Sequence, residues 1–259
     1  MTRAGYYAWR RRQASAHAVQ DRTLLEQIRT VFTQHHGRYG SPRIHDALQT
    51  RGIAVSRRRV ARLMREDGLR ARAVLGYRPK ASVLRFYDAQ PNLVRRTTTA
   101  AIDRVWVGDI TYLKVGTAWR YLAVVMDRCS RRILAWTLQR RRDGRVTRGV
   151  LAAALRRRQP AEGLIFHSDR GSEYLAETLS TFLAAQGVRQ SACTSGPGDN
   201  AHMESFFHSM KAEATRGRHF ATDAELRTVL REYIRYYNTT RAHSALAYRS
   251  PVDFERRAA

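Results

Sequence analysis

The sequence is poor in cysteine and in acidic residues and has no long apolar run, and each shortage narrows the class of protein. Two cysteines, Cys129 and Cys193, are too few for a disulfide framework, and no CxxC pair suggests a zinc site. No apolar stretch has the length needed to span a membrane, and no signal-peptide pattern is present. We therefore expect a protein of the reducing cytoplasm that does not work in a membrane.

Acidic residues are scarce relative to basic ones. The chain of 259 residues holds 47 Lys and Arg against 22 Asp and Glu, which gives a formal net charge of +25. Such an excess favours binding to polyanions through phosphate contacts and counterion release. A membrane surface is the rival polyanion, but no single basic amphipathic helix carries the charge. Nucleic acid is the expected partner.

Residues 1–75 are predicted to form an N-terminal arm followed by three short helices. We expect the helices over about residues 22–35, 41–52 and 56–68, with Ser41 and Ser56 as N-caps. The last helix buries an apolar stripe and is otherwise basic, which is typical of a helix-turn-helix whose third helix enters the major groove. A helical bundle with a solvated basic face is the alternative. The predicted DNA-binding arginines are Arg57, Arg58, Arg59 and Arg62. Residues 76–102 lack a sustained period and are predicted to be a linker.

Two aspartates occupy positions that call for an explanation. A carboxylate at the first is costly to bury without a partner, and the second lies where polar ligands bind. Asp109 lies within the alternating run RVWVGDITYL, on the same strand face as Val107 and Thr111. Burying an ionised group there without a partner costs several kcal/mol. Asp169 follows GLIFH, a short apolar run that predicts a buried strand. The carboxyl end of such a strand is where α/β proteins bind polar ligands. Ser172 is predicted to cap the next helix and Glu173 to complement its dipole.

The stretch DNAHMESFFHSMK predicts a helix with a carboxylate beside its buried stripe. Met203, Phe206, Phe207 and Met210 recur at helical spacing. Glu204, His208 and Lys211 share a neighbouring face, and Asp199 or Asn200 can cap the helix. Taken alone, the stretch favours an amphipathic helix bearing a solvated glutamate.

The order of elements predicts an α/β fold of the RNase H-like, integrase type, preceded by an all-α helix-turn-helix domain. Three strands, a helix, a strand, a helix, a short strand and a helix fill residues 103–220. In that order the middle of the first strand, the end of the fourth and the start of the last helix converge. These places hold Asp109, Asp169 and Glu204. Residues 221–259 are predicted to be a C-terminal helix and basic tail packed on this core.

The residues also carry a family resemblance. WVGDITYL, HSDRGSEY and DNAHMESFFHSMKAE resemble the three catalytic blocks of DDE transposases and retroviral-type integrases. Specifically, the chain is similar to the second-frame product of IS3-family insertion sequences, including YGSPRIHDALQTRG and the C-terminal YYNTTRAHSALAYRSP. The 34 residues between Asp169 and Glu204 are one fewer than the spacing associated with that family.

The resemblance implies an enzyme that cuts and joins DNA strands at the ends of its own element. It implies two Mg²⁺ ions, with Mn²⁺ able to substitute, because hard oxygen ligands suit both. Asp109 would bridge the ions, with Asp169 on one and Glu204 on the other. Lys211 would contact DNA, and Asn200 and His208 are lesser candidates for DNA contact.

The implied partners are double-stranded DNA, further copies of this chain on that DNA, and the upstream-frame product as a fusion, in the bacterial cytoplasm at the nucleoid. Two other functions stay open. One is a DNA-binding repressor of transposition whose carboxylates are vestigial. The other is a nuclease acting on RNA–DNA hybrids.

Overall fold

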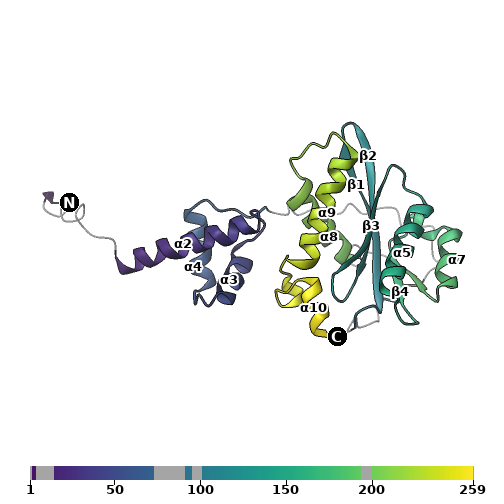
Figure 1. Ribbon diagram of the computed structural model, residues 1–259, viewed down its shortest axis with the longest axis horizontal. Helices are drawn as coiled ribbons and strands as arrows, with labels where there is room; N and C mark the ends of the chain where they lie inside the picture. Colours follow the sequence, from purple (N-terminus) through teal and green to yellow (C-terminus); the bar gives the residue numbers. More distant parts are fainter. Residues whose placement is uncertain (1, 4–14, 73–90, 95–100, 194–199, 259) are drawn as a thin grey trace. The chain divides into compact units, whose positions relative to one another are not determined.

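The computed structural model describes residues 2–3, 15–72, 91–94, 101–193 and 200–258. Contacts divide the chain into two compact units, residues 1–73 and 74–259 (Figure 1). Most of the predicted N-terminal arm, most of the predicted linker and the predicted cap Asp199 lie outside the described residues. Among the described helices, none has the length and apolar character required to cross a bilayer.

Between residues 15 and 72, the first unit consists of three helices packed on one small core. They are α2 (Ala16–Gln34), α3 (Ser41–Thr50) and α4 (Arg57–Glu66). The predicted cap Ser56 is confirmed, because its side chain accepts a hydrogen bond from the backbone N–H of Arg59 at 3.2 Å. The predicted cap Ser41 is wrong. Helix α3 begins at Ser41 itself, and Gly40 stands at the N-cap without a side-chain bond. The core residues are Leu24, Ile28, Val31, Ile44, Leu48, Val60, Leu63 and Met64.

The second unit is built on a five-stranded mixed sheet in the order β3-β2-β1-β4-β5. The strands are β1 (Val105–Val115), β2 (Ala118–Asp127), β3 (Ile133–Gln139), β4 (Ile165–Ser168) and β5 (Arg189–Ala192). The first three strands form an antiparallel meander, and β1, β4 and β5 are parallel. Long β1 therefore pairs along its length with β2 but only through its first half with β4.

Helices cover both faces of this sheet (Figure 1). Trp106, Ala123 and Leu134 pack with α5 (Gly144–Arg158) and α7 (Glu177–Ala185) on one face. The opposite side chains of β1 and β2 pack under α8 (Ala201–Met210) and α9 (Asp223–Thr239). Alternation along each strand thus gives two cores, one on each face.

The short helices differ in part from the prediction. The helix expected to run on from Ser172 is broken, because Ala176 is extended and separates α6 (Ser172–Leu175) from α7. Helix α8 continues directly into a π-helical turn, η1 (Lys211–Thr215). A 3₁₀ turn, η2 (Ser244–Leu246), then precedes α10 (Pro251–Ala258).

Residues 91–94 lie inside the predicted linker but are fastened to the sheet. The backbone N–H of Leu93 donates to Ser191 Oγ at 3.0 Å, and that of Ala192 donates to the carbonyl of Pro91 at 3.3 Å. Val94 is buried against Val105 of β1. The segment therefore extends the β4–β5 edge of the second unit.

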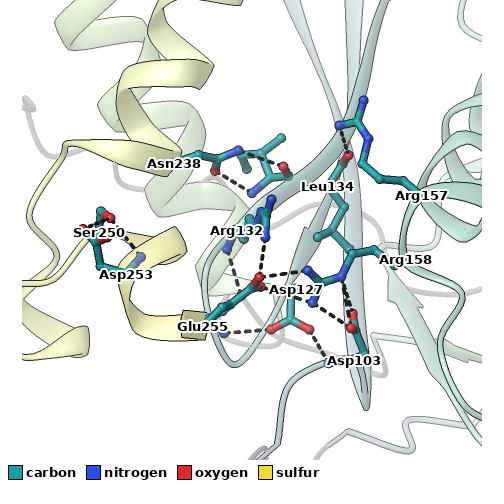
Figure 2. A network of polar contacts seen from close by, with 12 residues as sticks. Asp103, Asp127, Arg132, Leu134, Arg157, Arg158, Asn238, Ser250, Asp253 and Glu255 are labelled. Carbon is teal, nitrogen blue, oxygen red and sulfur yellow. Dashed lines mark hydrogen bonds and ion pairs between the residues drawn. The ribbon is translucent and has the colours of Figure 1, made fainter. Parts of the chain in front are cut away.

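A polar network fixes α10 to the sheet (Figure 2). The Glu255 carboxylate accepts hydrogen bonds from Ser130 Oγ and Arg158 Nη1, both at 2.8 Å, and also pairs with Arg132. Arg158 in turn pairs with Asp103 at 2.7 Å. Because Glu255 is buried, losing either arginine would leave its charge poorly compensated.

Candidate active site

The register of β1 and β4 brings Asp109 and Asp169 to adjacent positions. The parallel pairing runs from Val105 with Ile165 to Gly108 with Ser168; Asp109 is the next residue of β1, and Asp169 is the first residue after β4. Gly108 allows this close approach, since a Cβ on it would lie 2.5 Å from the Phe166 ring. A larger residue there would push β1 away from the ring and displace the following carboxylate.

The two carboxylates are half-buried, and the Asp169 charge acts on Asp109. Burial and the neighbouring Asp169 charge raise the pKa of Asp109 to about 8, although the Ile110 N–H bond at 2.7 Å opposes the shift. Burial also raises the pKa of Asp169, against an opposing bond from the Gly171 N–H at 3.1 Å. Two like charges in a desolvated site repel, so the pair favours a cation between or beside its oxygens.

Glu204 lies on a helical row whose other members touch β1 beside Asp109. One turn before it, Asn200 donates its side-chain N–H to the carbonyl of Gly108 at 3.2 Å. Two turns after it, the Lys211 ammonium stands 4.9 Å from the centre of the Tyr112 ring. Glu204 therefore lies between two residues of this row that contact β1 on either side of Asp109 in the sequence.

Glu204 itself is exposed to solvent, and the structure shows no contact between it and either aspartate. Within the described parts of the chain, no three His, Cys, Asp or Glu side chains are grouped as a metal site. The structure thus brings two of the three predicted acids together and leaves the third at the border. A third carboxylate beside the pair would add repulsion unless a cation offset it.

The lesser candidates on this helix have mixed placements. Asn200 is buried and makes no side-chain cap, so its amide holds α8 on β1 instead. Lys211 is half-buried in the π-helical turn; burial lowers its pKa, while the Asp109 charge acts in the opposite direction. His208 is half-buried. Lys211 places a cation within electrostatic reach of Asp109.

Glu173 lies in the first turn of α6, where an acid was expected to complement the helix dipole, and it also pairs with a cation that the sequence did not indicate. Only 3% of its side chain is exposed, and its Oε1 accepts from Arg142 Nε at 2.7 Å. Both charges act on the aspartates, since Glu173 raises and Arg142 lowers the pKa of Asp109 and of Asp169. An acid four residues after Asp169 was the visible signal, but nothing local pointed to Arg142.

The predicted DNA-binding arginines of α4 fall into two groups. Arg57 and Arg58 are exposed, and neither forms an ion pair with any described residue. Arg59 and Arg62 instead bind the Asp21 carboxylate of α2, at 2.7 and 2.6 Å. Arg59 and Arg62 are thus half-buried where full exposure was expected, because helix packing brings an acid from α2 onto their face, and their contact with DNA stays a prediction.

Three family models match the chain. An HTH-like domain matches residues 19–76, and two integrase core domain models match residues 100–197 and 204–258. The HTH-like model covers the three helices of the first unit. The two integrase core models cover the sheet, its helices and the C-terminal segment. The integrase-type α/β fold class predicted from the sequence is confirmed.

Curated relatives match over nearly the whole chain. The transposase for insertion sequence element IS904 of Lactococcus lactis is 38% identical over 95% of this chain and 98% of its own length. Transposase InsF for insertion sequence IS3A of Escherichia coli is 34% identical over 98% of this chain and 90% of its own. The HTLV-2 integrase catalytic core domain in complex with magnesium covers 59% of this chain and 94% of its own, at 14% identity and a TM-score of 0.43. The chain belongs to the IS3 family of insertion-sequence transposases.

Proposed function

We propose that this protein is a transposase that cuts DNA at the ends of its own insertion sequence and joins those ends to target DNA. The observation that carries the proposal is the parallel register that sets Asp109 beside Asp169 in a half-buried site. Asp109, Asp169 and Glu204 are the proposed catalytic acids. Family membership supports polynucleotidyl transfer in general, and the strand register supports Asp109 and Asp169 in particular.

The donor set fits a divalent cation. Asp109 and Asp169 each bind one backbone N–H through one oxygen, and the described contacts leave the second oxygen of each carboxylate available. Asp109 and Asp169 would hold the metal, with Glu204 as the third ligand and Asp109 shared between two ions. Mg²⁺, or Mn²⁺ in its place, supplies Lewis-acid activation of the phosphate and its attacking oxygen.

The chain's own residues supply the setting. Asn200 holds α8 against β1, which keeps Glu204 at the border of the site. Lys211, whose ammonium lies over the Tyr112 ring, would bind a phosphate next to the one that reacts. In the first unit, the exposed Arg57 and Arg58 are the side chains that would contact DNA. The proposed partners are double-stranded DNA, other copies of the chain on that DNA, and a fused upstream-frame product, at the nucleoid.

A repressor of transposition is the second candidate, and the solvent exposure of Glu204 favours it. Incubation of the protein with labelled element-end DNA and Mg²⁺ or Mn²⁺ separates the two. A transposase nicks the ends and joins them to target DNA, whereas a repressor binds the ends and leaves them intact. Cleavage confined to RNA–DNA hybrids would instead identify a hybrid nuclease.

The variants Asp109→Asn, Asp169→Asn and Glu204→Gln test the three acids. Each is expected to abolish nicking and joining while DNA binding stays near that of the unmodified protein. Glu232→Gln is the matched control, because Glu232 is an exposed glutamate on α9. Full activity of Glu204→Gln would remove Glu204 from the proposed site, and loss of both binding and cleavage in Asp109→Asn would make Asp109 structural.

A further inference from the structure

We propose that Arg142 binds a phosphate of the DNA substrate at the catalytic site and that Glu173 positions it for this contact. The inference rests on the proposed function, since it takes the site of Asp109 and Asp169 to be the place of strand cleavage. It adds a substrate-binding residue and a positioning residue that lie outside the three acids.

The Arg142–Glu173 pair is held from both sides. Arg142 stands directly before Asp143, whose side chain caps α5 by accepting from two backbone N–H groups at 3.0 and 3.1 Å. Glu173 lies in α6, where its carbonyl accepts from Thr147 Oγ1 of α5 at 2.9 Å. The Arg142 Nε and Nη2 atoms lie 2.7 and 2.5 Å from Glu173 Oε1. The guanidinium is therefore held between the N-terminal ends of α5 and α6, which are hydrogen-bonded to each other.

The backbone makes room for this pair at Gly171. A Cβ there would lie 2.5 Å from Glu173 Oε1 and 2.9 Å from Arg142 Nη2. The same glycine donates its N–H to the Asp169 carboxylate. One residue thus links the position of the guanidinium to the position of a proposed catalytic acid.

Arg142 is more than a counter-ion for Glu173. Its side chain is 44% exposed, whereas that of Glu173 is 3% exposed, so the pair presents the cation to solvent and buries the anion. The guanidinium is near enough to influence Asp109 and Asp169, yet the structure gives it no hydrogen bond to either. Only one edge is used by Glu173, which leaves donors for a further oxygen anion.

A DNA phosphate is the anion that fits. A guanidinium presents planar, parallel donors that match phosphate oxygens, and a fixed one loses little freedom when it binds. Cleavage and joining both place a negative phosphate beside the acidic pair, where a rigid cation stabilises the charge that develops in the transition state. Because Glu173 binds one edge of the Arg142 guanidinium, the cation does not form an ion pair with the aspartates instead.

The test combines protein variants with neutral methylphosphonate linkages placed one at a time near the cleavage point of element-end DNA. Arg142→Lys keeps a cation for Glu173 but loses the planar fork. At saturating DNA we expect it to cleave at least about tenfold more slowly, with little change in DNA affinity. Arg141→Ala is the control, because Arg141 is an exposed neighbour without a described partner, and it should cleave like the unmodified protein.

One methylphosphonate position should slow the unmodified protein about as much as Arg142→Lys does, and the two changes together should slow it no further. Glu173→Gln should lose part of the rate and become less sensitive to that same linkage, while its urea midpoint stays close to that of the unmodified protein. A merely structural role would give additive effects at every linkage.

Additive effects, or an Arg142→Lys rate equal to that of Arg141→Ala, would overturn this inference. The failure is distinct from failure of the proposed function. If Asp109→Asn is inactive while Arg142→Lys is fully active, the acids stand and Arg142 has no part in binding the phosphate. If Asp109→Asn is active, the proposed catalytic site itself is refuted.

Discussion

Replacing Asp109 with asparagine is expected to stabilise the fold while it destroys the activity. The unfolded chain ionises this carboxyl near pH 3.8, whereas burial and the Asp169 charge keep it protonated in the folded protein up to about pH 8. The folded state therefore binds more protons than the unfolded state between these two values. Linkage then requires the free energy of unfolding to fall as the pH rises from about 4 to 8.

The same two pKa values give the size of the stability lost through Asp109 as the pH rises. A pH of 7 lies about three units above the pKa of this carboxyl in the unfolded chain and still below its pKa in the folded protein. The free energy of unfolding is therefore lowered by roughly 4 kcal/mol at 1.36 kcal/mol per unit. Asparagine removes the ionisable group but leaves a buried amide N–H₂ that costs about 1–3 kcal/mol if it is not hydrogen-bonded. We therefore expect Asp109→Asn to gain about 1–3 kcal/mol at pH 7 and less at pH 5.

Urea unfolding with EDTA present measures this directly, followed by the fluorescence of the tryptophans in the second unit. Asp253→Asn is the control, because Asp253 lies on α10 with half of its side chain exposed. The advantage of Asp109→Asn over the unmodified protein should widen from pH 5 to pH 8. An advantage that stays constant with pH, or a variant less stable at every pH, would refute the burial of Asp109 beside another carboxylate.

Three further changes probe other parts of the structure. Replacing both Arg57 and Arg58 with alanine should weaken DNA binding and lower the slope of log affinity against log salt by about 2, measured by fluorescence anisotropy. Gly108→Ala should destabilise the second unit by about 1–3 kcal/mol in urea and slow cleavage, because the new Cβ meets an aromatic ring of β4. Arg241→Ala should cost about 3–5 kcal/mol, since it leaves Glu213 buried without its cation.

Each of these changes has a matched control. Arg65→Ala removes an exposed arginine from the same helix as the first pair, and an equal loss of affinity would mean that binding depends on net charge alone. Gly149→Ala places a Cβ in open space within α5 and should leave stability unchanged or raised. Combining Arg241→Ala with Glu213→Gln should recover part of the lost stability, and no recovery would contradict the buried pair.

Local patterns predicted most of the elements and singled out two of the acids that the strand register brings together. Asp109 could be found because a charge interrupts an alternating strand, and Asp169 because it ends a short apolar run. Their adjacency follows from the parallel pairing of β1 with β4, which periodicity alone does not fix. The order of elements supplied that step, because it implied which strands become neighbours.

Contacts between distant segments were beyond local patterns. Arg59 and Arg62 read as outward-facing on their own helix, but α2 brings Asp21 across to them. Likewise, Glu173 resembled an ordinary first-turn acid until the loop before α5 placed Arg142 against it. In both cases the partner lies more than 30 residues away, so only the packing of helices reveals the pair.

The central claim is that Asp109, Asp169 and Glu204 meet around divalent metal. A crystal structure of the protein with element-end DNA and Mn²⁺, with the ion located by its anomalous scattering, tests that claim most directly. We predict anomalous density in contact with carboxylate oxygens of both aspartates, and an oxygen of Glu204 within coordination distance. Manganese bound elsewhere, or bound to the aspartates with Glu204 still in solvent, would contradict it.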